Sequence, residues 1–302
     1  MLTCPLSALE RFEAVEPHMG SMVRMVAYAH DISQARQAFS AAFARVAELD
    51  SILSEYKPDS ELNRLCASRS AIASRDLFNV LEGAQRLSEE SDGAFDITAG
   101  PLIRLWRETR KTRILPDAQR LEAARALTGW RKLKLDPTTR RATLTTPGMQ
   151  LDVGGIAKGF VADEALAVLT RHGIASAMVA ASGDIAVSHP PPGKRSWTIT
   201  VELLGGTRDL EIHDAAVSTA GDTEQFVELG GVRYSHILDP KTGMALTRRI
   251  AVSVVAPTGL EADGLDTAIS VLGREPGVAL MKRHPKARAV IVTDHGVFET
   301  AR

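Results

Sequence analysis

The stretch Leu151-Asp-Val-Gly-Gly-Ile-Ala-Lys-Gly-Phe-Val-Ala-Asp-Glu-Ala-Leu166 joins a glycine turn to the start of a helix. Apolar residues recur at three- and four-residue steps after Gly154-Gly155, which predicts an amphipathic helix. A glycine turn that leads into a helix exposes backbone N–H groups suited to an anion, and Lys158 adds a positive charge there. The spacing matches neither the Walker loop nor the G-x-G-x-x-G fingerprint. The stretch alone leaves two interpretations open, a phosphate-binding loop and an ordinary strand-to-helix turn.

The segments on either side of this stretch alternate between helical and strand patterns. Helices are predicted over residues 33–51, 75–91, 101–110, 116–127 and 260–272, and strands over residues 21–28, 175–180, 185–187, 197–203 and 250–256. Many of these predicted strands are expected to be joined as hairpins. We therefore expect an α+β fold with mixed, largely antiparallel sheets and packed helices, in one large globular unit. Residues 1–18 are expected to be an N-terminal lead-in to a single domain over residues 19–302.

The composition excludes several classes of partner. The 302 residues carry a net charge of −1, so no global field attracts nucleic acid or an anionic membrane. We expect the basic residues between Arg104 and Arg113 to form a solvated face rather than a nucleic-acid site. No apolar run approaches the ~20 residues of a membrane span, and nothing resembles a signal peptide. These features predict a cytoplasmic protein, and Cys4 and Cys66 form no disulfide framework.

Two segments elsewhere in the chain carry polar side chains in patterns that fit a binding site. Asp263 and Thr267 are four residues apart on one predicted helix, so their oxygens share a face that can bind Mg²⁺. Asp263 also fits a solvated acid in the first turn of a helix. His236 lies in a loop beside Asp239, where a histidine can act as acid or base, orient a ligand, or be structural.

Taken together, the motifs of this chain resemble those of the ApbE family, the Mg²⁺-dependent flavin transferases. The matching pieces occur in the family's order and extend from Met19 to about Gly296. They are Met19-Gly-Ser-Met22, Tyr56-Lys-Pro-Asp-Ser-Glu-Leu-Asn-Arg-Leu65, Gly93-Ala-Phe-Asp96, Gly100-Pro-Leu102, Asp152-Val-Gly-Gly-Ile-Ala-Lys-Gly159, Ser182-Gly-Asp-Ile185, Ser218-Thr-Ala-Gly221, Tyr234-Ser-His-Ile-Leu-Asp-Pro-Lys-Thr-Gly243 and Glu261-Ala-Asp-Gly-Leu-Asp-Thr-Ala268. Such an ordered series is far more specific than any one of its motifs.

The resemblance implies roles for individual residues. Asp263 and Thr267 match the acid and the threonine that bind Mg²⁺ in the family, and the backbone carbonyl of that set matches Gly155. The positions that contact FAD match Met19, Tyr56, Ala94, Phe95, Asp96, Asp152, Lys158 and His236. The chain departs from the family pattern at Cys66, where asparagine is common, at Ala220, where serine is common, and at Thr223, where tyrosine is common.

The activity that the resemblance implies is Mg²⁺-dependent transfer of FMN from FAD to a threonine or serine hydroxyl of an acceptor flavoprotein, with release of AMP. Two alternatives stay open: hydrolysis of FAD to FMN and AMP at the same metal site, and flavin binding without turnover. For the transfer, we expect Asp263 and His236 to be the catalytic residues. Either His236 or a neighbouring carboxylate would take the proton of the attacking hydroxyl.

Overall fold

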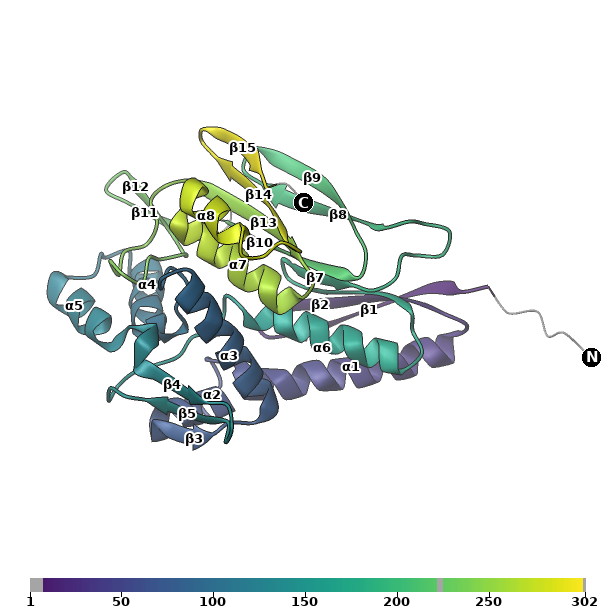
Figure 1. Ribbon diagram of the computed structural model, residues 1–302, viewed down its shortest axis with the longest axis horizontal. Coiled ribbons are helices and arrows are strands. Elements are labelled where there is room, and N and C mark those ends of the chain that lie inside the picture. The colour runs from purple at the N-terminus through teal and green to yellow at the C-terminus, as the bar shows by residue number, and fades with distance from the viewer. Residues whose placement is uncertain (1–7, 222–224, 301–302) are drawn as a thin grey trace, which may run out of the picture.

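The computed structural model describes residues 8–221 and 225–300, and its main element is an eight-stranded sheet (Figure 1). The strand order is β1-β2-β6-β7-β10-β13-β14-β15, and neighbouring strands are antiparallel. The strands are β1 (Glu10–His18), β2 (Ser21–Ala29), β6 (Ser176–Ala181), β7 (Asp184–Val187), β10 (Ala215–Gly221), β13 (Ile250–Ala256), β14 (Arg288–Thr293) and β15 (Gly296–Glu299). The predicted α+β class with largely antiparallel sheets is confirmed. Thr223, which departs from the family pattern, lies outside the residues that the structure describes.

The first strand lies in the segment that was predicted to be a lead-in. β1 pairs with β2 along its whole length, so residues 10–18 are part of the main sheet. An edge strand needs few buried side chains, and in β1 Phe12 and Ala14 pack against the main core while acidic residues face outwards. This sparse apolar pattern is why the sequence of β1 does not read as a strand.

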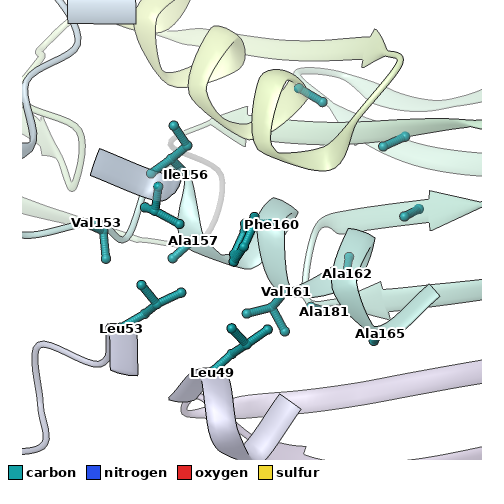
Figure 2. Packing of buried hydrophobic residues seen from close by; sticks show 14 of the residues in the cluster. Leu49, Leu53, Val153, Ile156, Ala157, Phe160, Val161, Ala162, Ala165 and Ala181 are labelled. Atoms are coloured by element: carbon teal, nitrogen blue, oxygen red, sulfur yellow. The ribbon is translucent and has the colours of Figure 1, made fainter. Parts of the chain in front are cut away.

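One face of the sheet is covered by helices α1 (Ile32–Leu53), α6 (Ala157–Arg171) and α7 (Gly259–Leu272). Helices α3 (Arg75–Glu90) and α8 (Arg274–Met281) pack against α7. Figure 2 shows Leu49 and Leu53 of α1 facing Val153, which lies just before α6, and Val161, which lies in α6. α6 is thus held in the main core, between α1 and α7. Within residues 8–221 and 225–300, no helix has the length and apolarity to cross a membrane.

The opposite face is covered by a hairpin of β8 (Trp197–Leu203) and β9 (Gly206–Ile212). Every second residue of β8 is buried, from Trp197 to Leu203, and the residues between them are exposed. This alternation is the pattern of a strand with one face on the core. β13 lies between the two layers and has almost every residue buried, which explains its continuous apolar sequence.

A third region lies at the end of the sheet where α6 begins (Figure 1). α4 (Gly100–Thr112) is fixed there because Trp106 donates a hydrogen bond to the Gly243 carbonyl at 2.8 Å and packs against the Tyr234 ring. The remaining elements are α2 (Glu61–Ser68), β3 (Ser70–Ile72), η1 (Ile97–Ala99), α5 (Ala118–Leu127), η2 (Trp130–Lys132), β4 (Leu133–Asp136), β5 (Arg141–Leu144), β11 (Phe226–Leu229) and β12 (Val232–Ser235).

Candidate functional site

The stretch around Gly154-Gly155 forms a tight turn that leads directly into α6. Asp152 Oδ1 accepts a hydrogen bond from the Gly154 N–H at 2.9 Å, which holds the turn together. Ile156 and Ala157 then donate their N–H groups to the Val153 carbonyl. No side chain caps α6, so the helix begins from the turn itself. The predicted glycine turn and helix start are both present.

α6 and α7 touch through two glycines. A β-carbon on Gly159 would lie 2.0 Å from the Gly259 carbonyl oxygen, and one on Gly259 would lie 2.3 Å from the Gly159 carbonyl oxygen. Both positions therefore require glycine. Asp163 fixes α7 at the same point, because its carboxylate accepts hydrogen bonds from the N–H groups of Gly259 (2.7 Å) and Leu260 (3.1 Å). Burial raises the pKa of Asp163 to about 6.

The three expected metal ligands converge beside this crossing. Asp263 and Thr267 lie one turn apart on α7, and a β-carbon on Gly155 would be 3.0 Å from Thr267 Oγ1. Asp263 Oδ2 accepts a hydrogen bond from the Gly159 N–H at 3.0 Å, so its carboxylate points to the first turn of α6. The structure thus brings Gly155, Asp263 and Thr267 to one side of the glycine turn.

Two more buried carboxylates surround Lys158, which donates to Asp184 Oδ2 at 2.6 Å. Ser218 Oγ lies 2.5 Å from both Asp184 Oδ1 and Asp266 Oδ2. Burial, together with the charge of Asp184, raises the pKa of Asp263 to about 8. Burial and Asp263 raise the pKa of Asp266 well above its ordinary value. Burial opposes the charge of Lys158, but Asp184 and Asp263 outweigh it and raise the Lys158 pKa.

This arrangement fits a divalent cation. Among the described residues, Asp184, Asp263 and Asp266 are all buried around the one cation of Lys158, so three ionised carboxylates would leave an excess of negative charge. In the part of the chain that the structure describes, no group of three His, Cys, Asp or Glu side chains is placed to hold one ion. The protein would instead offer one carboxylate, one hydroxyl and one carbonyl oxygen, a set that leaves room for substrate phosphate oxygens.

The expected flavin contacts from Ala94 to Asp96 are of two kinds. Phe95 borders the glycine turn, because a β-carbon on Gly155 would lie 3.5 Å from its Cε2 atom, and Ala94 is buried next to it in the chain. The Asp96 carboxylate, by contrast, is engaged within the protein. It accepts hydrogen bonds from the Thr98 N–H and hydroxyl (2.8 and 2.6 Å) and from the Trp130 N–H (2.8 Å). A ligand contact of Asp96 stays a prediction.

Arg107, which was expected on a solvated face, connects Tyr56 and Asp152. Arg107 Nη2 lies 2.9 Å from Asp152 Oδ2 and 2.9 Å from Glu55 Oε1, and the guanidinium carbon lies 4.8 Å from the centre of the Tyr56 ring. Its side chain is 25% exposed. The expectation is therefore wrong for Arg107. The linear sequence gives no signal for this role, because both carboxylates come from segments far from α4 in the chain.

Met19 lies in the turn between β1 and β2, and His236 lies in the segment that follows β12. The β1–β2 turn that contains Met19 lies at the same end of the strands as Asp184. Val23 of β2 pairs with Ala181 of β6, and Ala181 pairs with Asp184 of β7. The backbone N–H and the Nδ1 atom of His236 lie 2.9 and 3.1 Å from the Gln225 carbonyl oxygen. Both contacts hold the His236 loop against the start of β11, and neither reaches the carboxylate cluster.

The parts played by Asp184 and Ser218 also escaped prediction. The Ser218-Thr-Ala-Gly221 piece gave Ser218 no role, and the structure shows Ser218 between two carboxylates in the middle of β10. Asp184 lies at the start of β7, within the Ser182-Gly-Asp-Ile185 piece of the family pattern. The match of this piece to the family pattern was the one signal that could have singled out Asp184, but the match alone assigns it no role.

Fold and site together define a class: an α+β protein in which buried carboxylates converge on a glycine-lined helix start, a site suited to a cation and an anionic ligand. The model of the ApbE family matches residues 19–292, and the chain belongs to the ApbE family. It is 31% identical to the FAD:protein FMN transferase of Treponema pallidum over 94% of this chain and 85% of that protein. Identity to the Vibrio cholerae protein of the same name is 33%, over 84% and 79% of the two chains.

Solved structures show the same likeness. The apo form of the Pseudomonas stutzeri flavinyl transferase ApbE superimposes with a TM-score of 0.84 at 31% identity, and the match covers 98% of this chain and 96% of that one. The flavin transferase ApbE from Vibrio cholerae gives a TM-score of 0.85 at 28% identity and covers 96% of both chains. The similarity therefore extends over nearly the whole fold.

Proposed function

We propose that this chain transfers FMN from FAD to a threonine or serine hydroxyl of an acceptor flavoprotein and releases AMP. One observation carries the proposal: Gly155, Asp263 and Thr267 converge beside Lys158 in a chain of the ApbE family. The relatives named FAD:protein FMN transferase support the choice of substrate and reaction. A flavin carrier without turnover would have no need of a metal held by Asp263 and Thr267.

In this proposal the FAD diphosphate lies against the glycine turn and Lys158. Asp263, Thr267 and the Gly155 carbonyl would hold Mg²⁺, which would supply positive charge to neutralise the diphosphate. Phe95 would form an apolar wall beside the turn, which is supported by the 3.5 Å between its Cε2 atom and the position of a β-carbon on Gly155. The remaining proposed FAD contacts are Met19, Tyr56, Ala94, Asp96, Asp152 and His236.

The proposed reaction is a phosphoryl transfer, in which no group is oxidised or reduced. The acceptor hydroxyl oxygen forms a bond to the FMN phosphorus while the bond from that phosphorus to the bridging oxygen breaks, and AMP leaves. Lys158 keeps its positive charge, because neighbouring carboxylates raise its pKa, and it stabilises negative charge on the phosphoryl oxygens. The hydroxyl proton passes to a base, for which His236 and the carboxylate cluster are the candidates.

The direct test incubates the purified protein with FAD, Mg²⁺ and a candidate flavoprotein subunit, followed by intact-mass measurement of the subunit. We expect one covalently bound FMN per acceptor and an equal amount of AMP. Rapid AMP release without acceptor would replace the proposal with an FAD pyrophosphatase. FAD that survives long incubation under both conditions would indicate a flavin carrier. A serine-to-alanine or threonine-to-alanine change at the modified acceptor residue serves as the matched control.

A further inference from the structure

Arg107 connects two parts of the proposed flavin site that are far apart in the sequence. Its Nη2 atom lies at 2.9 Å from both Asp152 Oδ2 and Glu55 Oε1, and all three side chains are largely buried. A guanidinium can donate to two carboxylates and present its flat face to an aromatic ring at the same time. Arg107 does this, because it also lies over the Tyr56 ring.

The contact with Asp152 extends to the glycine turn. Asp152 has one oxygen on Arg107 and the other on the Gly154 N–H at 2.9 Å. Rotation of the Asp152 carboxylate would break both hydrogen bonds. Arg107 therefore fixes the carboxylate that holds the turn, and the turn places Gly155 beside Thr267, because a β-carbon on Gly155 would lie 3.0 Å from Thr267 Oγ1.

The contact with Tyr56 extends to the mouth of the site. Tyr56 is 70% exposed, which is unusual for a large aromatic side chain, and Arg107 covers one face of its ring. The segment before it is held as well, because Glu55 is bound to the same guanidinium. A ring supported on one face and exposed elsewhere is suited to stack on a planar ligand ring.

We propose that Arg107 is a positioning residue for FAD, which holds the exposed Tyr56 ring and the Asp152-anchored glycine turn in one arrangement before the substrate arrives. The inference rests on the proposed function. Arg107 acts through Tyr56 and Asp152, so its loss weakens FAD binding more than it slows the reaction of bound FAD.

The test measures FAD binding by flavin fluorescence in EDTA, and KM and kcat for FMN transfer with Mg²⁺. Arg107→Lys keeps the positive charge but cannot serve two carboxylates and a ring. We expect the Kd and KM of this variant for FAD to rise by about tenfold, and kcat to change by less than about threefold. Tenfold is the lower end of the loss seen when a residue that orients a binding side chain is changed. Arg104→Gln on the exposed side of α4 is the matched control and leaves all three values unchanged.

A second pair of variants separates positioning from simple destabilisation. In the Tyr56→Ala background the loss caused by Arg107→Lys shrinks to less than about threefold, because part of its effect passes through Tyr56. A lowered melting temperature with unchanged Kd and KM would overturn the proposal and leave Arg107 with a structural role. Full additivity of the two changes would overturn it as well. If the unaltered protein binds no FAD either in EDTA or with Mg²⁺, the proposed function fails and the role of Arg107 fails with it.

Discussion

The two faces of the main sheet are covered in different ways. On the helical face, Asp184, Asp263 and Asp266 are buried around Lys158 where α6 and α7 cross. On the other face, the hairpin of β8 and β9 buries apolar side chains and leaves its polar ones outside, where Thr198 pairs with Glu211. Buried charges cost stability unless they are fully paired, whereas buried apolar surface contributes to it. The comparison indicates that the hairpin face serves stability and that the helical face gives up some stability to form a site.

The largest expected effect concerns Asp263. In Asp263→Ala we expect FMN transfer to fall by more than about 100-fold, because a proposed metal ligand is lost, while FAD binding is largely kept. In EDTA the variant should be at least as stable as the unaltered protein, because one of three crowded carboxylates is gone. Transfer rates by mass spectrometry, FAD titration and thermal melting measure these quantities. The exposed Asp294→Ala variant is the control, and undiminished transfer in Asp263→Ala would contradict the metal assignment.

The second effect concerns the crossing of the helices. Gly159→Ala places a β-carbon against the Gly259 carbonyl oxygen, and neither backbone has room to move. We expect a loss of about 3 kcal/mol in unfolding free energy, at the upper end for an overpacked core, together with loss of FAD binding. Urea unfolding measures the stability.

Gly83→Ala is the matched control for this helix glycine. Its β-carbon would meet the end of the Leu260 side chain, which can move aside. A stability change within about 1 kcal/mol is expected, because alanine also favours the helix. Equal losses in the two variants would show that the glycine contact between α6 and α7 has no special importance.

The third effect tests the hairpin face. Ile199 is buried, and Ile199→Ala should cost about 2 kcal/mol of unfolding free energy, the lower end for such a truncation because the hairpin can settle inwards. FAD affinity and transfer rate should not change, in contrast to the helical face. Thr200→Ala, on the exposed side of the same strand, should stay within about 0.5 kcal/mol. A large loss of FAD affinity in Ile199→Ala would remove the distinction between the two faces.

The smallest effect is a pH dependence near α7. His284 lies 2.7 Å from Glu261 and 3.0 Å from Glu90, and the hydrogen bond to Glu261, followed by the charge of Glu90, raises its pKa. The stabilisation is complete below the unfolded-state pKa of about 6.5 and is lost as pH rises through the higher folded-state pKa. His284→Gln should thus be less stable than the unaltered protein at pH 5.5, by less than about 1 kcal/mol, and the difference should shrink towards pH 9. Urea unfolding at both pH values measures it, and a difference that grows with pH would contradict this sign.

Periodicity and turn residues were sufficient to predict most of the fold. The alternating residues of β8 and the helical spacing after Gly159 each reflect one-sided burial, which a linear pattern records directly. β1 escaped because an edge strand buries too little to leave such a pattern. The sequence Thr258-Gly-Leu-Glu261 has the pattern of a capping box, and the structure forms half of it. The Thr258 hydroxyl accepts a hydrogen bond from the Glu261 N–H, but the Glu261 carboxylate binds His284.

The site was predictable only where residues lie close in sequence or match the family pattern. The spacing of Asp263 and Thr267 placed them on one helix face, and the structure has them there, beside Gly155. Arg107 could not be found in this way, because its partners Glu55 and Asp152 belong to distant segments. Pairings between distant segments depend on the tertiary fold, and neither charge nor periodicity along α4 distinguishes Arg107 from its solvated neighbours.

The contact between Gly159 and Gly259 has a consequence for the energetics of the whole site. Two backbones in direct contact cannot slide or rotate against each other without separating, so the angle between α6 and α7 is settled when the chain folds. The entropy of arranging the reacting groups is therefore lost during folding, before any substrate is bound. An incoming dinucleotide would therefore meet a rigid frame at this crossing.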